Sequence, residues 1–150
     1  MQNRKRVSFI ESMKAGQELL ASAPGSHRQI AALFSDYGQA LGEFTQGKVG
    51  VACVTEDGHR PVEGDFQVGV PMSIVLVSHV RPETPSPIVA GLEISQFGFP
   101  VMFRFRGSRQ SAFNVEAVSD VLHSLAQSDV FASALHDLMR LEPEAVLYQS

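Results

Sequence analysis

The segment Pro87–Gly107, PIVAGLEISQFGFPVMFRFRG, decides the fold that we predict for this chain. Its apolar residues alternate with other residues on both sides of a central glycine, which is the pattern of two antiparallel strands joined by a tight turn. We predict a β-hairpin that reverses about Phe97 and Gly98. A four-residue loop over residues 96–99 would give the same register and suits Phe97 better, because phenylalanine rarely adopts a positive φ.

One register of this hairpin separates two unlike faces. The apolar face then holds the pairs Ile94–Val101, Leu92–Phe103 and Ala90–Phe105. The other face holds the pairs Ser95–Pro100, Glu93–Met102, Gly91–Arg104 and Val89–Arg106. A shift by one residue would instead set Leu92 against Met102 and mix apolar with charged partners on one face. We therefore predict the first register.

Helical periodicity occupies both ends of the chain. The tetrads Ser8–Glu11 and Ser26–Gln29 have the spacing of capping boxes, and Pro24-Gly25 lies between them. This pattern predicts two N-terminal helices, one on each side of Pro24-Gly25. Near the other end, Asn114 and Ser128 are good N-caps for two C-terminal helices.

Period-two patterns occupy the middle of the chain. We predict strands over residues 49–54 and 65–80, joined by a turn at Asp57-Gly58. Residues 74–77 are apolar on both faces, as in a strand that is covered on both sides, and Pro71 marks a bulge, bend or edge position. No helical stretch long enough for a parallel crossover separates the strands.

The predicted fold class is therefore α+β. We expect a single domain over residues 1–150, with an antiparallel sheet of four or five strands, two N-terminal helices and two C-terminal helices. Residues 1–7 are expected to form a flexible basic tail.

Composition narrows the class of protein. Of the 150 residues, 44% are hydrophobic and 19% charged, which favours a folded chain over a disordered one. The formal net charge of −4 counts against general phosphate binding. A single cysteine excludes an internal disulfide, and no stretch approaches the roughly 20 apolar residues of a membrane helix. We expect a cytoplasmic protein without a membrane partner.

The residues that usually carry catalysis or metals form no recognisable motif. The histidines are scattered singly, at His27, His59, His79, His123 and His136. Nucleophile-elbow, zinc-protease and glycine-rich phosphate motifs are missing, and Cys53 lies on an apolar strand face. We therefore predict no catalytic residue, no metal and no cofactor. An enzyme whose site assembles from distant histidine and acidic residues remains an alternative, with His79 as its first candidate.

The second face of the hairpin is the predicted binding surface. Its candidate partner-binding residues are Glu93, Met102, Arg104, Arg106 and Arg109. Arginine and methionine are enriched at protein interfaces, so an uncovered face of this kind would suit a protein partner. The plainer alternative is a solvated face on which Glu93 pairs with Arg104. We predict a non-enzymatic protein-interaction module, such as an inhibitor, adaptor or chaperone, that forms a homo-oligomer.

A nucleic-acid-associated protein is the other alternative. It would use a basic N-terminal arm and the stripe of hairpin arginines, which together comprise Arg4, Lys5, Arg6, Arg104, Arg106 and Arg109. The predicted register counts against it, because Phe103 and Phe105 point to the face opposite the arginines. Binders of single strands need stacking and charge on the same side.

Overall fold

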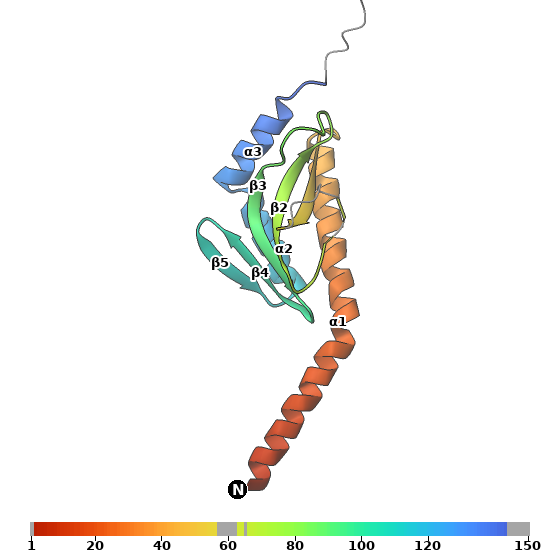
Figure 1. The fold of residues 1–150 in the computed structure, drawn as a ribbon, viewed down its shortest axis with the longest axis vertical. Coiled ribbons are helices and arrows are strands. Elements are labelled where there is room, and N and C mark those ends of the chain that lie inside the picture. The colour runs from red at the N-terminus through yellow and green to blue at the C-terminus, as the bar shows by residue number, and fades with distance from the viewer. Residues whose placement is uncertain (1, 57–62, 65, 144–150) are drawn as a thin grey trace, which may run out of the picture.

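The computed structural model describes residues 2–56, 63–64 and 66–143, with side chains from residue 8 onward. A long helix comes first, followed by five strands and two shorter helices (Figure 1). The elements are α1 (Gln2–Phe44), β1 (Val49–Thr55), β2 (Pro71–Ser78), β3 (Ile88–Ser95), β4 (Gly98–Phe105), β5 (Ser108–Ala112), α2 (Val115–Ala126) and α3 (Asp129–Met139). All five strands form one antiparallel sheet in chain order, which confirms the α+β prediction. The turn predicted at Asp57-Gly58 lies outside the described residues.

Strands β3 and β4 pair in the predicted register. Leu92 lies opposite Phe103, with Gly91–Arg104, Glu93–Met102 and Ile94–Val101 as the neighbouring pairs. The turn differs from the prediction, because the register shifts after Ile94 and Ser95 pairs with Gly98 instead of Pro100. Gly98 has a φ of +95°, whereas Phe97 does not adopt a positive φ. The glycine thus takes the left-handed conformation that phenylalanine would resist, as in a turn closed by a glycine bulge.

The other strands depart from prediction in extent. Strand β2 begins only at Pro71, because proline cannot donate to the ladder and is tolerated best as the first residue of a strand. Strand β5 follows Gly107 and is the fifth strand of a sheet predicted to have four or five. The chain reverses just before it, where Arg106 and Gly107 have φ angles of 56° and 70°. Two consecutive positive φ angles suit a two-residue hairpin turn.

The prediction of two N-terminal helices is wrong, because α1 runs unbroken from Gln2 to Phe44 with Pro24 inside it. The backbone of residues 2–7, predicted as a tail, belongs to this helix. A proline inside a helix costs about 3 kcal/mol, since it removes one hydrogen bond and crowds the preceding turn. Packing on both sides offsets that cost, because Ala23 and Ile30 are 4% and 0% exposed. Figure 1 shows the helix bending near its middle, as expected at a proline.

Both C-terminal helices begin where their caps predict. Asn114 Oδ1 accepts a hydrogen bond from the Ala117 amide at 2.8 Å, and Ser128 Oγ accepts one from the Phe131 amide at 3.2 Å. Each cap satisfies an amide that the first helical turn leaves without a partner. Local sequence is therefore enough to place α2 and α3.

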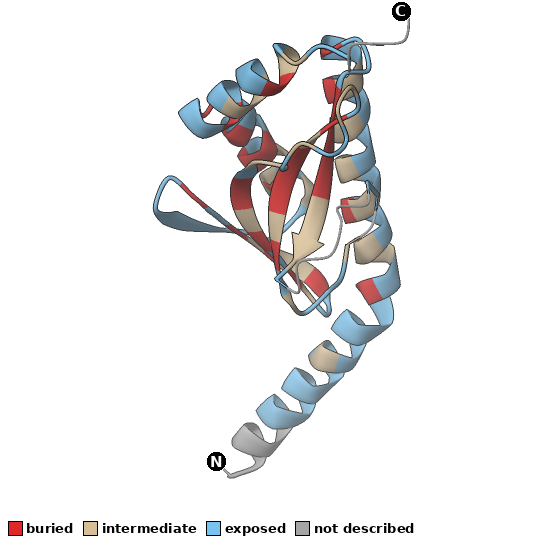
Figure 2. Cartoon of the chain, turned by 45° about the horizontal axis from the view of Figure 1, so that its top comes forward, coloured by how far each residue is buried: buried red, intermediate tan, exposed pale blue. Residues whose placement is uncertain are grey.

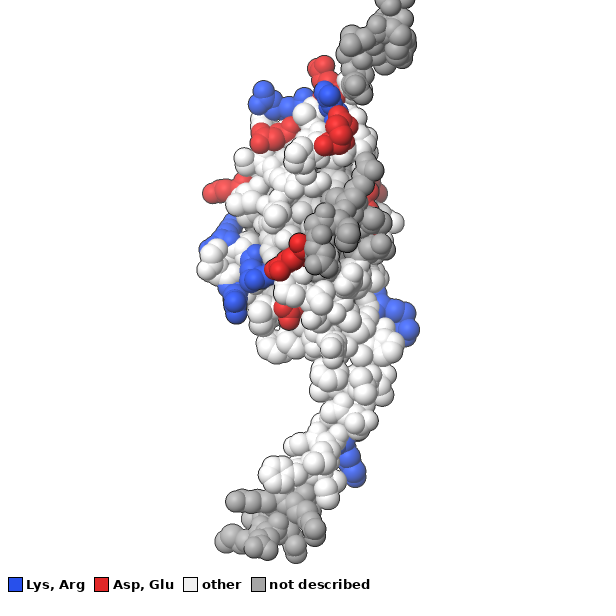
Figure 3. Space-filling model, viewed as in Figure 1, with Lys and Arg blue, Asp and Glu red and all other residues white. Residues whose placement is uncertain are grey.

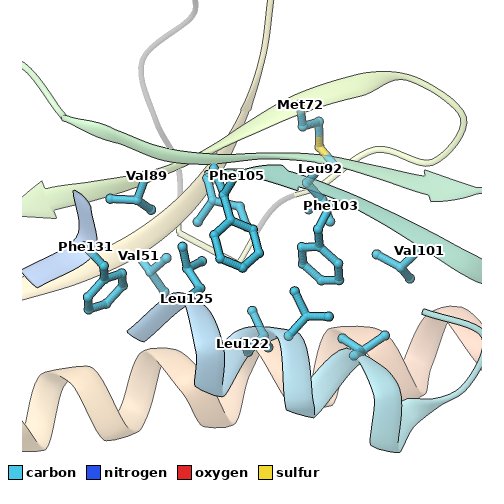
Figure 4. Close-up of a cluster of buried hydrophobic side chains, with 14 of the residues drawn as sticks. Val51, Met72, Val89, Leu92, Val101, Phe103, Phe105, Leu122, Leu125 and Phe131 are labelled. Carbon is cyan, nitrogen blue, oxygen red and sulfur yellow. The ribbon is translucent and has the colours of Figure 1, made fainter. Parts of the chain in front are cut away.

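The core lies between one face of the sheet and the helices. Phe103 points from β4 toward Leu122 of α2, and Phe131 of α3 lies on the same side of the sheet (Figure 4). Helix α1 crosses this layer and contacts both β1 and β4. Tyr37 of α1 donates a hydrogen bond to the Leu122 carbonyl at 3.1 Å, so α1 and α2 are joined directly. No described helix covers the opposite face of the sheet (Figure 1).

Candidate functional site

The uncovered face is polar and accessible over β3, β4 and β5. Alternation and the ladder place Glu93, Met102 and Arg104 on it, with Arg109 of β5 beside Arg104. Of these, Met102 is half-buried and the others are exposed. Toward β1 and β2 the same face becomes apolar and buried, since Ala52 and Val75 are each 3% exposed. The accessible part of this face is therefore the half that β3, β4 and β5 form.

Arg104 and Arg109 lie directly opposite each other on neighbouring strands. A Cβ atom on Gly91 would come within 2.9 Å of Arg104 Nε, so the Arg104 side chain lies across β3 in the space that this glycine leaves. The two arginines also line a shallow hollow of about 310 Å³ together with Phe105, Gly107 and Ser108. Like charges directly opposite on a sheet repel each other. An anionic group placed between them would relieve that repulsion.

Arg106 and Glu93, two other predicted binding residues, are arranged differently from Arg104 and Arg109. Arg106 occupies the turn between β4 and β5. Its Cζ atom lies 5.8 Å from the centre of the Phe105 ring, a cation–π distance. Within the described residues, the ion pairs are His79–Glu63 and Arg81–Glu83. The alternative in which Glu93 pairs with Arg104 is therefore not formed. Figure 3 shows basic side chains gathered over the β4–β5 end of the molecule.

Ile88 adds an apolar residue to this face that sequence reasoning missed. The β2–β3 ladder skips Val89, so Val75 pairs with Ile88 instead. Ile88 is 62% exposed, whereas Val89 is 3% exposed and belongs to the core. This bulge reverses the expected alternation, and no local signal in the sequence marks it.

The two groups of basic residues in the nucleic-acid alternative are not brought together. Arg4, Lys5 and Arg6 belong to the first turns of α1, and the helix meets the sheet only near Ala23. At 1.5 Å per residue, roughly 25 Å of helix separates Arg6 from that point. Phe103 and Phe105 are 0% and 8% exposed in the core, so neither can stack on a base at the arginine face.

His79 has both ring nitrogens engaged. Its Nδ1 lies 2.9 Å from the Gly47 carbonyl, and its Nε2 lies 2.8 Å from Glu63 Oε2. A carbonyl only accepts, so Nδ1 donates, and donation from Nε2 to the carboxylate as well requires the charged imidazolium. Burial lowers the pKa of His79, but the hydrogen bonds to Glu63 and Gly47 and the Glu63 charge outweigh it, so the pKa lies above 6.5.

We expect Glu63→Gln to lower the pKa of His79 in the folded protein, because it removes the charge that favours imidazolium. The raised pKa also means that this contact stabilises the fold fully below about pH 6.5 and loses that effect as the pH rises through the folded-state pKa. An NMR titration of the His79 ring, assigned with His79→Asn, measures the shift. Identical titration midpoints in wild type and Glu63→Gln would contradict this account.

Among the histidines that the structure describes, none joins His79 in a catalytic cluster. His27 contacts the Ser95 carbonyl at 3.2 Å, which ties α1 to the end of β3. His123 and His136 are exposed on α2 and α3, and His59 lies outside the described residues. Within the described part of the chain, no three histidine, cysteine, aspartate or glutamate side chains converge as a metal site.

A hollow lies between α1 and the edge strand β1. It has a volume of about 520 Å³, and its lining includes Phe34, Gly38, Cys53, Glu63 and Phe66. Burial raises the pKa of the Cys53 thiol to about 12. A thiol that stays protonated at neutral pH is a poor nucleophile and a poor metal ligand. Cys53 therefore acts here as a small apolar lining residue.

No family model, curated protein or solved structure matches the chain. Along the described residues, no helix combines the length and apolar character needed to cross a membrane.

Proposed function

We propose that this chain is a non-enzymatic protein-interaction module that binds its partner through the open face of β3, β4 and β5. The observation that carries the proposal is the pair formed by Arg104 and Arg109, which lie directly opposite each other without an acidic partner among the described residues. Glu93 lies on the same face but forms no ion pair with either arginine, although such a pair would stabilise the sheet. A partner that supplies the carboxylate would gain the same interaction on binding.

The neighbouring residues define the chemistry of the partner. Arginine forms bidentate hydrogen bonds with carboxylates, so an aspartate or glutamate side chain fits between Arg104 and Arg109. The exposed Ile88 and half-buried Met102 supply apolar contact on the same face. We therefore expect an acidic segment that also carries an apolar side chain. An inhibitor, adaptor or chaperone role would each use such a surface.

Selection of peptides from a random library on the immobilised protein tests this proposal before the natural partner is identified. We expect selected peptides to combine aspartate or glutamate with an apolar residue. The double variant Arg104→Glu/Arg109→Glu should bind them at least tenfold more weakly, because each charge-assisted hydrogen bond contributes about 1.5–3 kcal/mol.

The matched control is Arg28→Glu/Lys48→Glu, which changes the net charge equally at two positions away from this face. It should bind the peptides like wild type, and circular dichroism should show both variants folded. Equal binding by all three proteins, or equal loss in both variants, would refute the proposed face. Capture from a lysate of the native cell, compared between the same variants, then identifies the natural partner.

A further inference from the structure

The N-terminal part of α1 projects beyond the sheet, and its described residues are almost all exposed (Figures 1 and 2). We call residues 8–22 the arm. From residue 8 onward, the first buried residue of the helix is Ala23, and every arm residue is exposed except the half-buried Gly16. The large apolar residues on the arm are Phe9 (64% exposed), Ile10 (46%), Met13 (69%), Leu19 (52%) and Leu20 (55%). An exposed apolar helix surface of this kind is typical of an interaction site.

The spacing of these residues specifies the covering element. Phe9, Met13, Gly16, Leu20 and Ala23 follow one another at intervals of four, three, four and three residues. That alternation is the a/d seam of a coiled coil, which packs knobs into the holes of another helix. Farther along α1, Ile30, Phe34, Tyr37 and Leu41 continue the same spacing and face the core. The arm therefore extends a packing stripe past the point where the sheet ends.

We propose that the arm pairs with the arm of a second copy of this chain, as an antiparallel two-helix coiled coil. This surface is separate from the open sheet face, so the proposal does not depend on the proposed function. In the antiparallel arrangement, Phe9 packs against Leu20 of the second copy, and Met13 packs over Gly16 of the second copy.

The size of the seam residues favours the antiparallel arrangement over the parallel one. A parallel pair would set each residue against its own copy, so Gly16 would face Gly16 and leave a void beside the bulky Met13 and Leu20 layers. In the antiparallel pair, the long Met13 side chain fills the space above Gly16, where a Cβ would meet nothing within 4 Å of the same chain. The seam is therefore complementary to itself about a twofold axis.

The charges on the arm permit this pairing. Glu11, Lys14 and Glu18 lie on the side of the helix opposite the seam. The positions flanking the seam hold Ile10, Ser12, Gln17 and Leu19, none of which is charged. Two arms can thus approach without burying a charge or opposing like charges. Ile10 and Leu19 also widen the apolar contact on both sides of the seam.

The exposed area is sufficient for a reversible dimer. The five large apolar side chains of the arm offer roughly 500 Å² per chain, or about 1,000 Å² for a pair. That value stands at the lower end of specific interfaces, which suits a monomer–dimer equilibrium.

Sedimentation equilibrium of the full chain tests the dimer. We expect wild type to be dimeric at a chain concentration of about 100 μM, because chains with even a weak interface of this size associate at that concentration. Met13→Glu and Leu20→Glu should each weaken dimerisation at least tenfold, because each buries a charge in the seam. Both positions are exposed in the single chain, so circular dichroism should show the variants folded. The matched control, Ala15→Glu, adds the same charge outside the seam and should remain dimeric.

Disulfide trapping tests the orientation. In a Cys53→Ala background that is first shown to dimerise, Phe9→Cys and Leu20→Cys chains are oxidised separately and as an equimolar mixture. The antiparallel pair brings positions 9 and 20 together but keeps the two copies of position 9 about 16 Å apart. A disulfide needs Cα atoms closer than about 7 Å, so only the mixture should cross-link efficiently.

Three results would overturn the proposal. A wild type that stays monomeric in the sedimentation experiment would exclude the second copy, and binding of that monomer to phosphatidylserine-containing vesicles would assign the arm to a lipid surface. Dimers that persist in Leu20→Glu would place the interface elsewhere. Efficient disulfides within the Phe9→Cys and Leu20→Cys chains alone would indicate parallel helices.

Discussion

Replacing Phe103 with alanine is expected to lower the free energy of unfolding by about 3–5 kcal/mol. Phe103 is fully buried and is among the largest residues in the core. It lies on β4, opposite Leu92 of β3, and faces Leu122 of α2 (Figure 4). Truncation would remove contacts to both layers and leave a cavity that the sheet and helix cannot close, because neighbouring strands hold the backbone in place.

The matched control for Phe103→Ala is Phe113→Ala. Phe113 is 69% exposed just after β5, so its truncation should change the free energy of unfolding by less than about 0.5 kcal/mol. Urea unfolding followed by circular dichroism, at one protein concentration, measures both variants. Similar losses in the two variants would mean that Phe103 does not anchor the core.

Replacing Gly98 with alanine is expected to lower the free energy of unfolding by about 2–4 kcal/mol, which is a large effect for the addition of one methyl group. Two effects combine at this position. The φ of +95° is strained for any residue with a side chain, and a Cβ there would collide with Cβ of Ser26 on α1. The turn of the β3–β4 hairpin therefore packs closely against α1 because Gly98 has no side chain.

Gly47→Ala separates these two effects. Gly47 also has a positive φ, +81°, but a Cβ there would meet nothing within 4 Å. Its replacement should therefore cost only the backbone strain, about 1 kcal/mol. The same unfolding experiment compares the two variants, and the difference between them measures the contact with Ser26. Equal losses of unfolding free energy in the two variants would show that α1 moves to accommodate the added methyl group.

Local patterns were sufficient for much of the fold. The two faces of the hairpin followed from alternation, because one register alone places Leu92 and Phe103 together and keeps Arg104 off the core face. The starts of α2 and α3 followed from Asn114 and Ser128, whose side chains satisfy amides only a few residues away. Each of these signals acts within one element or between adjacent strands.

Elements whose stability comes from distant contacts were not predictable in this way. Strand β5 has the polar sequence SRQSA and exposes all but its last residue, so only pairing with β4 makes it a strand. The contact of His79 with Glu63 depends on a loop returning to the sheet. The exposure of Ile88 depends on a bulge in the ladder.

The sequence by itself determined the antiparallel hairpin, its register and the two C-terminal helix caps, because side-chain periodicity and capping act over a few residues. Only the tertiary structure decided that α1 continues through Pro24. The local cost of a proline predicts a break there, and packing of Ala23 and Ile30 against the rest of the protein outweighs it. Tertiary structure also decided that the helices cover one face only, which leaves Arg104 and Arg109 open. Whether the second face is covered as well depends on the packing of whole layers, and no local pattern encodes it.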